Sequence, residues 1–213
     1  MEHVTRDAGA EDAIDIAKLY YLAGKSHVDR SIYDLMIPGP PGMTEERIEA
    51  IAKIASTEAP SWLNLSHYKV IEVDGKVASG LATFTTEEAG GRQLGQAMME
   101  AGWGAKDLLS MGCRLRVWSG VDPGREHGYL VVENVATLDG FRGNGFSAEL
   151  LALAIESARE QGLKGLQLTV LLGNDPAIRV YEKAGFELVK SKESKKFNKV
   201  FTSPGAGQML LKF

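Results

Sequence analysis

The sequence predicts an α/β fold in which helices flank a mixed, largely antiparallel central sheet. Residues 68–84 read as two strands around Asp74-Gly75-Lys76, which is a strong hairpin signal. Residues 129–172 alternate strand, helix and strand, a pattern typical of parallel neighbours. The 213-residue length suits one domain with a buried core. We therefore expect a single domain over residues 1–213.

The first third of the chain predicts one short strand and two helices. Val4–Arg6 reads as the strand, and Glu11–Ala23 has the apolar spacing of a helix. The Pro-Gly run at 37–42 cannot be helical and is expected to be a loop. Thr44 is the predicted N-cap of the second helix, which Pro60 ends.

Residues 85–128 predict a helical insertion between the third and fourth strands. The stretch is rich in glycine, and its apolar residues favour a helix at Leu94–Ser110. Leu115–Trp118 has the composition of a further strand.

The final third has the clearest pattern. Its predicted elements are a strand at 129–137, a helix at about 147–161, a strand at 166–172, a helix ending at Gly185, and strands at 186–190 and 208–213. Asp175 is the expected N-cap of the second of these helices, with Pro176 at its first position. The lysine-rich segment between the last two strands is predicted to be a solvated loop.

Composition limits the classes of partner. The net charge of −4 disfavours nucleic acid, because phosphate neutralisation needs a basic surface. One cysteine, Cys113, excludes an internal disulfide and fits a reducing compartment. Residues 1–9 are charged and polar, unlike a signal peptide, and no apolar run approaches the ~20 residues of a membrane span. These features predict a cytoplasmic protein without a membrane partner.

A short glycine loop, Phe-Arg-Gly-Asn-Gly-Phe-Ser at 141–147, stands where a strand becomes a helix. Gly143 and Gly145 permit backbone conformations closed to other residues, so successive N–H groups can converge on an anion. A P-loop would need Gly-Lys-Ser/Thr, which is missing. A dinucleotide fingerprint would need a third glycine, where this sequence has Ala148 or Glu149.

The loop has a second motif downstream of it. Asn174, Ala177, Val180-Tyr181-Glu182-Lys183 and Gly185-Phe186 follow after one helix and one strand. Together the two motifs resemble the GNAT superfamily of acetyl-coenzyme A-dependent N-acetyltransferases, over about residues 129–187. The one departure is Ser147, where that family usually has Gly or Ala. The resemblance implies the GNAT-like acyltransferase fold and acetyl-CoA as the acetyl donor.

The resemblance also implies which residues bind the coenzyme. The N–H groups of residues 143–147 would hold its pyrophosphate, with Arg142 opening the loop. The pantetheine arm would lie along the strand before the loop, and Asn174 would contact the coenzyme unless it only caps a helix. The implied binding residues are Val135, Ala136, Thr137, Arg142, Gly143, Asn144, Gly145, Phe146, Ser147 and Asn174.

Two side chains are candidates for proton transfer. Tyr181 resembles the family's tyrosine that protonates the departing thiolate, and a phenol keeps its proton at neutral pH. Glu133 could take a proton from the attacking ammonium, directly or through water. The alternatives are that Tyr181 is a core residue and that Glu133 is a surface or ion-paired glutamate.

The acceptor is predicted only as a primary amine of a small molecule or peptide, attacked in a ternary complex without a metal. His27, His67 and His127 lack the spacing of metal ligands. Trp103, Trp118, Met98 and Met99 line an acceptor pocket or a subunit contact, or pack in the core. Family members often dimerise, so a homodimer is one assembly that the resemblance allows. The rival hypotheses are a non-catalytic coenzyme A sensor and an enzyme that binds another nucleotide.

Overall fold

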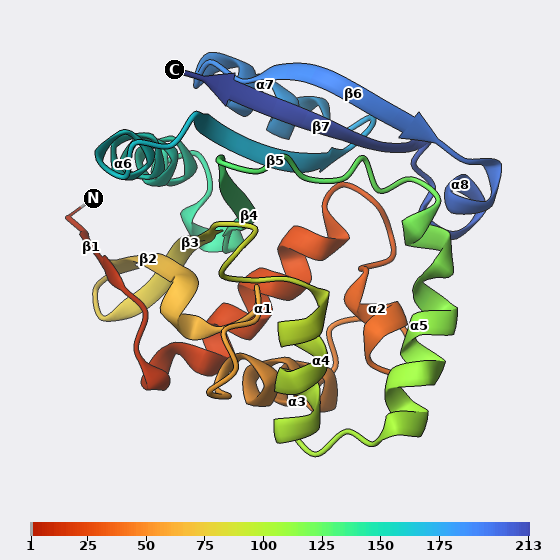
Figure 1. The fold of residues 1–213 in the computed structure, drawn as a ribbon. Coiled ribbons are helices and arrows are strands. Elements are labelled where there is room, and N and C mark those ends of the chain that lie inside the picture. Colours follow the sequence, from red (N-terminus) through yellow and green to blue (C-terminus); the bar gives the residue numbers. More distant parts are fainter. Residues whose placement is uncertain (1) are drawn as a thin grey trace.

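A seven-stranded sheet forms the centre of the computed structural model, which describes residues 2–213 (Figure 1). The strand order is β1-β2-β3-β4-β5-β7-β6, and of these neighbours β4 and β5 are parallel while the others are antiparallel. This confirms the mixed, largely antiparallel α/β fold. The strands are β1 Val4–Asp7, β2 Tyr68–Val73, β3 Lys76–Phe84, β4 Leu130–Thr137, β5 Gly165–Leu171, β6 Glu187–Glu193 and β7 Gly205–Lys212.

Helices cover both faces of this sheet. The α-helices of residues 2–213 are α1 Ala13–Lys25, α2 Tyr33–Met36, α3 Glu45–Ala55, α4 Gly91–Glu100, α5 Ala105–Ser119, α6 Phe146–Glu160, α7 Asp175–Lys183 and α8 Lys195–Phe201. Three short 3₁₀ turns lie at Ala10–Asp12, Leu65–His67 and Asp139–Phe141 within the same part of the chain. Helix α1 contacts α3 and β4, whereas α6 contacts β2 to β5. The two helical layers therefore enclose separate cores.

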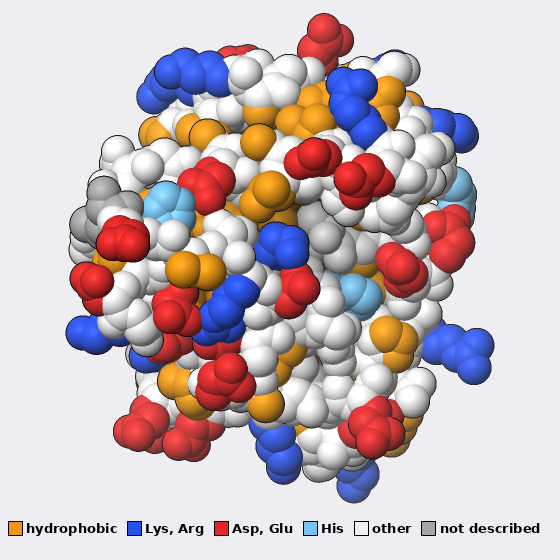
Figure 2. All heavy atoms as spheres, turned by 90° about the vertical axis from the view of Figure 1, so that its left-hand side faces the viewer, with side chains coloured by type: hydrophobic (Ala, Val, Ile, Leu, Met, Phe, Trp, Pro, Cys, Tyr) orange, Lys and Arg blue, Asp and Glu red, His pale blue; other side chains and the backbone are white. Residues whose placement is uncertain are grey.

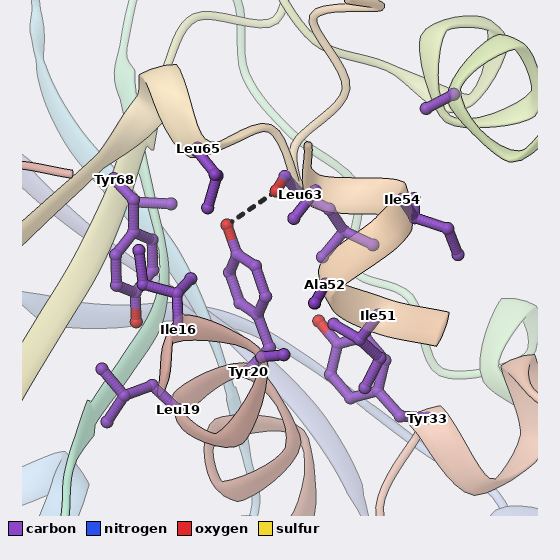
Figure 3. Close-up of a cluster of buried hydrophobic side chains, with 14 of the residues drawn as sticks. Ile16, Leu19, Tyr20, Tyr33, Ile51, Ala52, Ile54, Leu63, Leu65 and Tyr68 are labelled. Atoms are coloured by element: carbon purple, nitrogen blue, oxygen red, sulfur yellow. Dashed lines mark hydrogen bonds between the residues drawn. The ribbon is translucent and has the colours of Figure 1, made fainter. Parts of the chain in front are cut away.

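The core beneath α1 and α3 is built around tyrosines (Figure 3). The rings of Tyr20 and Tyr68 meet edge-on at 5.0 Å between centroids, and the Tyr20 hydroxyl donates to the Leu63 carbonyl at 2.9 Å. Ile16 and Ile51 are fully buried beside them. Burial of these large rings stabilises the layer, and the hydrogen bond satisfies the phenol that burial would otherwise leave unpaired.

Strands β4 and β5 separate soon after they begin. Within the described residues they pair at Leu130–Leu166 and Val131–Gln167, and no further pairs follow along β4. The remaining residues of β4 pair on their other side with β3. One edge of residues 132–137 is therefore open in the middle of the sheet.

A β-bulge interrupts β4 at Asn134. Gly80 pairs with Ala136 and Ala82 with Glu133, so Asn134 and Val135 both lie opposite Leu81. Asn134 has a φ of 53°, the left-handed region that Asn tolerates better than most residues. The extra residue reverses the alternation of faces beyond it.

The side chains on either side of the bulge show this reversal. Val132 packs in the core under α6, and Val135, three residues later, packs against the same core. Val131 and Ala136 both pack against the core under α1. The simple alternation of a regular strand therefore fails beyond Glu133.

The insertion between β3 and β4 differs from its prediction. Its helical character is confirmed, but the expected helix at Leu94–Ser110 is wrong, because α4 ends at Glu100 and α5 begins at Ala105. Gly102, with a φ of 95°, lies in the break. The expected strand at Leu115–Trp118 is also wrong, since these residues form the last turns of α5.

Two smaller predictions in the last third also fail. The N-cap of α7 is Asn174 and not Asp175, because the Asn174 side chain accepts a hydrogen bond from the Ala177 N–H. The lysine-rich segment contains α8, which buries Phe197 and Phe201 while its lysines face solvent. Two phenylalanines four residues apart on one helical face give α8 its anchor.

The surface is evenly charged on the face that carries the N-terminal strand. Acidic and basic side chains are interspersed there and do not form one continuous basic stripe on that face (Figure 2). No helix within residues 2–213 is long and apolar enough to cross a membrane.

Candidate active site

The glycine loop connects β4 to α6 through two left-handed residues. Gly143 has a φ of 84° and Gly145, the N-cap of α6, a φ of 81°. A Cβ at either position would meet nothing within 4 Å, so backbone conformation and not space requires glycine there. The two turns bend the loop over the first turn of α6.

Five consecutive backbone N–H groups in this loop have no hydrogen-bond partner among the described residues. Ala148 and Glu149 donate to the Gly145 carbonyl at 2.9 and 3.1 Å. The N–H groups of 143–147 donate to no acceptor within residues 2–213. Free N–H groups at a helix N-terminus, together with the helix dipole, suit an anion such as a pyrophosphate. This is the fit that the predicted coenzyme requires.

Hydroxyl groups tie the loop to the end of β4. The Thr137 hydroxyl lies 2.8 Å from the Ser79 hydroxyl and 3.2 Å from the Ser147 hydroxyl. Ser147, the one departure from the family pattern, therefore links α6 to the sheet. Arg142 pairs with Asp139 at 3.0 Å and donates to the Thr137 carbonyl at 3.3 Å.

Asn174 uses both ends of its amide inside the protein. Its oxygen caps α7, and its nitrogen donates to the Ser26 hydroxyl at 2.7 Å. The side chain thus joins the end of β5 to the segment after α1. Asn174 also lines the cavity described next, so the capping interpretation holds and a ligand contact is compatible with it.

A single cavity of about 1240 Å³ collects the predicted site residues. All twelve line it: Glu133, Val135, Ala136, Thr137, Arg142, Gly143, Asn144, Gly145, Phe146, Ser147, Asn174 and Tyr181. The volume exceeds the roughly 300–1000 Å³ of an ordinary small-molecule pocket, which leaves room for two substrates together. The cavity continues into the open edge of β4, where the strand's backbone can pair with an extended ligand.

Glu133 faces the cavity as part of an ion pair. Its carboxylate contacts the Arg125 guanidinium, and both side chains remain about a quarter exposed. Arg125 also lies over two rings, 5.2 Å from the Phe84 centroid and 5.6 Å from the Trp62 centroid. This cation–π packing keeps the guanidinium beside Glu133.

Tyr181 lies on the opposite side of the sheet from α1, in the core under α6 and α7. Its ring meets Phe186 edge-on at 6.1 Å. Burial raises the pKa of the Tyr181 phenol to about 12. The phenol therefore keeps its proton across the physiological pH range. Tyr181 both packs against the core and lines the cavity.

The bulge residue Asn134 is a cavity residue that the sequence analysis missed. Its carbonyl accepts from the Tyr68 hydroxyl at 2.8 Å, and its side-chain oxygen accepts from the Tyr33 hydroxyl at 3.2 Å. Its buried Nδ2 has no acceptor within residues 2–213, and the residue lines the cavity. An asparagine inside a β-branched strand was the available signal, because Asn favours the left-handed region.

Gly80 makes this arrangement possible. A Cβ on Gly80 would lie 2.3 Å from the Tyr68 ring, so glycine lets the ring cross β3 toward the Asn134 carbonyl. The tyrosines under α1 thereby hold the bulge that shapes the cavity.

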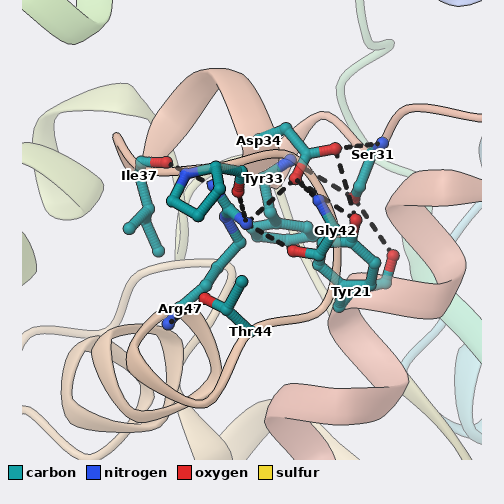
Figure 4. A network of polar contacts seen from close by, with 9 residues as sticks. Tyr21, Ser31, Tyr33, Asp34, Ile37, Gly42, Thr44 and Arg47 are labelled. Atoms are coloured by element: carbon teal, nitrogen blue, oxygen red, sulfur yellow. Dashed lines mark hydrogen bonds and ion pairs between the residues drawn. The ribbon is translucent and has the colours of Figure 1, made fainter.

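A buried polar network fixes the Pro-Gly loop beside α3 (Figure 4). The Arg47 guanidinium lies 3.2 Å from the Asp34 carboxylate, and both side chains are almost fully buried. Arg47 also donates to the carbonyls of Ile37, Pro40 and Gly42. Asp34 in turn accepts from the Tyr21 hydroxyl and from the N–H groups of Ser31 and Gly42. The network holds α2, which supplies Tyr33 and Met36 to the cavity wall.

The glycine loop, the open strand and the predicted site residues thus share one cavity. The family model described as Acetyltransferase (GNAT) family matches residues 44–186. The chain therefore belongs to the GNAT acetyltransferase family, as the motifs at 141–147 and 174–186 predict.

Individual relatives agree with this assignment. The Acetyltransferase Atu2258 of Agrobacterium fabrum is 36% identical over 64 residues, which are 30% of this chain and 45% of that protein. The match thus spans less than half the length of that relative. An N-acetyltransferase from Staphylococcus aureus Mu50 has a similar structure, with a TM-score of 0.72, 22% identity and coverage of 98% of this chain and 100% of that one. A GNAT-family acetyltransferase from Streptococcus pneumoniae superposes with a TM-score of 0.55 at 19% identity, covering 99% of each chain. At these identities, the two structures support the fold alone.

Proposed function

We propose that this protein transfers an acetyl group from acetyl-CoA to a primary amine by direct attack in a ternary complex. The observation that carries the proposal is the single cavity, which joins five free loop N–H groups to Glu133 and Tyr181. Its volume accommodates donor and acceptor at once, as direct transfer requires. A single domain over 1–213 and an acceptor that is a small molecule or peptide belong to the same proposal.

The donor half of the proposal assigns binding to the backbone. The N–H groups of 143–147 hold the pyrophosphate, and the open edge of β4 at Val135 and Ala136 pairs with the amides of the pantetheine arm. Thr137 and Arg142 support the loop through the contacts described above. Asn174 contributes at the end of β5 while it caps α7.

The chemical half of the proposal assigns proton transfer to two side chains. Glu133 accepts a proton from the acceptor ammonium, because only the neutral amine has a lone pair for attack on the acetyl carbonyl. Tyr181 donates to the sulfur as the carbon–sulfur bond breaks. The phenol pKa of about 12 lies above that of a thiol, about 8.5, so hydrogen bonding to the thiolate is its main contribution. No step of this mechanism uses a metal ion.

A thiol-release assay with acetyl-CoA over a panel of primary amines tests the proposal. Amine-dependent release of coenzyme A supports it, as does thermal stabilisation by coenzyme A that ATP and NAD do not give. Coenzyme A binding without thiol release for any amine favours the sensor hypothesis instead. Stabilisation by ATP or NAD alone contradicts the donor assignment.

A further inference from the structure

The wall of the cavity opposite the donor site is apolar and rich in rings. We call this wall the acceptor chamber. It comes from α2, the segment before β2, and the insertion helices α4 and α5. Its members that matter here are Tyr33, Met36, Trp62, Leu94, Leu115 and Trp118. A chamber of this composition binds its ligand mainly through apolar contact.

Charges in the acceptor chamber are few, and they lie in an ion pair or on a solvent-exposed residue. Among the cavity-lining residues of 2–213, the carboxylates are Asp122 and Glu133, and Arg125 neutralises Glu133. Asp122 is exposed to solvent and accepts from the Gly124 N–H at 2.8 Å. An ammonium group placed against the apolar side chains of the chamber would therefore bury positive charge without a partner, which is strongly unfavourable.

The outer side of the acceptor chamber is held in place by α5. Arg114 donates to the carbonyls of Leu35 and Met36 at 2.7 and 3.0 Å, which fastens α5 to α2. Trp118 packs on Phe197 of α8 at 5.7 Å between centroids. The apolar wall is thus a fixed surface that a ligand meets in this shape.

From these observations we infer that the acceptor is a monocationic primary amine on an apolar, ring-bearing body, and not a polyamine or another polycation. The inference rests on the proposed acetyl transfer and names its substrate class. The apolar body lies against Trp62, Leu115 and Trp118, and the amine reaches Glu133. Transfer forms the amide carbon–nitrogen bond and breaks the carbon–sulfur bond. The ammonium gives one proton to Glu133. The nitrogen loses a second proton as the amide forms, and this proton balances the one that the thiolate sulfur takes up, so the coenzyme leaves as its thiol.

Two matched amines test the acceptor class. With acetyl-CoA at neutral pH, kcat/KM for 2-phenylethylamine should exceed that for 1,5-diaminopentane by about tenfold or more, because the diamine brings a second ammonium where the phenyl ring meets apolar side chains. A ratio of one or less would overturn the inference.

A charge variant in the acceptor chamber sharpens the test. Leu115→Glu adds a carboxylate to the wall of the chamber, on a helix that is partly exposed to solvent. It should lower the ratio of kcat/KM for 2-phenylethylamine to kcat/KM for 1,5-diaminopentane by about tenfold. Leu109→Glu is the control, since Leu109 lies on the same helix, is 73% exposed and does not line the cavity. The control should keep this ratio within about twofold of the wild-type value. Equal shifts in both variants would contradict the inference that the wall at Leu115 contacts the acceptor.

A binding experiment separates failure of the inference from failure of the proposed function. If no amine releases thiol, acetyl transfer fails, and the two amines are titrated calorimetrically into the protein saturated with coenzyme A. Tighter binding of 2-phenylethylamine still supports an apolar acceptor chamber. Equal or tighter binding of the diamine overturns it.

Discussion

The glycine loop and the acceptor chamber lie in one cavity but present different parts of the polypeptide to a ligand. The loop presents backbone N–H groups while side chains such as Arg142 turn toward solvent and Asp139. The chamber presents side chains, which come from helices and from the segment before β2. Backbone contacts survive most substitutions as long as the left-handed glycines remain. Side-chain contacts change with every substitution, so one half suits a shared donor and the other an individual acceptor.

Removal of the Arg47 side chain should have the largest effect of these changes, and it acts on the stability of the acceptor half. Arg47→Ala leaves Asp34 buried without its partner and frees three carbonyls, so the free energy of unfolding should fall by about 3–5 kcal/mol. Urea denaturation measures it. Lys53→Ala, at an exposed position of the same helix, is the control and should change little. A loss below about 1 kcal/mol would show that the network contributes little.

Substitution of Glu133 tests the point where the two halves meet. Glu133→Gln removes the proton acceptor and should lower kcat/KM by about 100-fold. The variant should bind coenzyme A as the wild type does, because the loop N–H groups are untouched. Full activity across neutral pH would rule out Glu133 as the base.

Substitution of Tyr181 tests the donor half. Tyr181→Phe should lower kcat by about tenfold, the value of a hydrogen bond to a charged group, with acetyl-CoA binding preserved. Because burial raises the phenol pKa to about 12, the protonated form persists through pH 10, and activity should show no alkaline loss there from this residue. Tyr129→Phe, outside the cavity, is the control. An unchanged kcat for Tyr181→Phe would contradict the proposed role of Tyr181 as the hydrogen-bond donor to the sulfur.

The smallest expected effect concerns the conformation of the loop. Gly145→Ala places a Cβ on a residue with a φ of 81° and should cost about 1 kcal/mol of stability. It should also weaken coenzyme A binding. Gly140→Ala is a matched control, because its added Cβ also meets nothing within 4 Å but its φ is not left-handed. Equal effects in the two variants would mean that the loop conformation is not what binds the donor.

The same two halves differ in how far sequence predicts them. Local rules predict the donor half, because the strand, the glycines and the apolar helical face all lie between Leu130 and Glu160. They fail where distant residues decide the structure. One such place is the break between α4 and α5 at Gly102. Another is the bulge at Asn134, which is held by Tyr33 and Tyr68, 101 and 66 residues away in the sequence.

The acceptor half also depends on a buried charged side chain, Arg47, whose burial cannot be predicted from composition. Arginine is rarely buried in proteins. Arg47, in the first turn of α3, is nearly fully buried because the Pro-Gly loop folds over it. The loop at 37–42 is predicted as a loop, but its fixed shape comes from Arg47 and Asp34. The predicted roles of Glu133, Tyr181 and the coenzyme-binding residues await the experiments above.

The bulge in β4 makes this strand sensitive to its length. Because Asn134 is one extra residue, deleting it would return Val135 and Ala136 to strict alternation and exchange the layers into which they point. Thr137 would then turn away from Ser147. Related chains can therefore vary the residue types along β4, but a one-residue insertion or deletion before the glycine loop should be rare among active members.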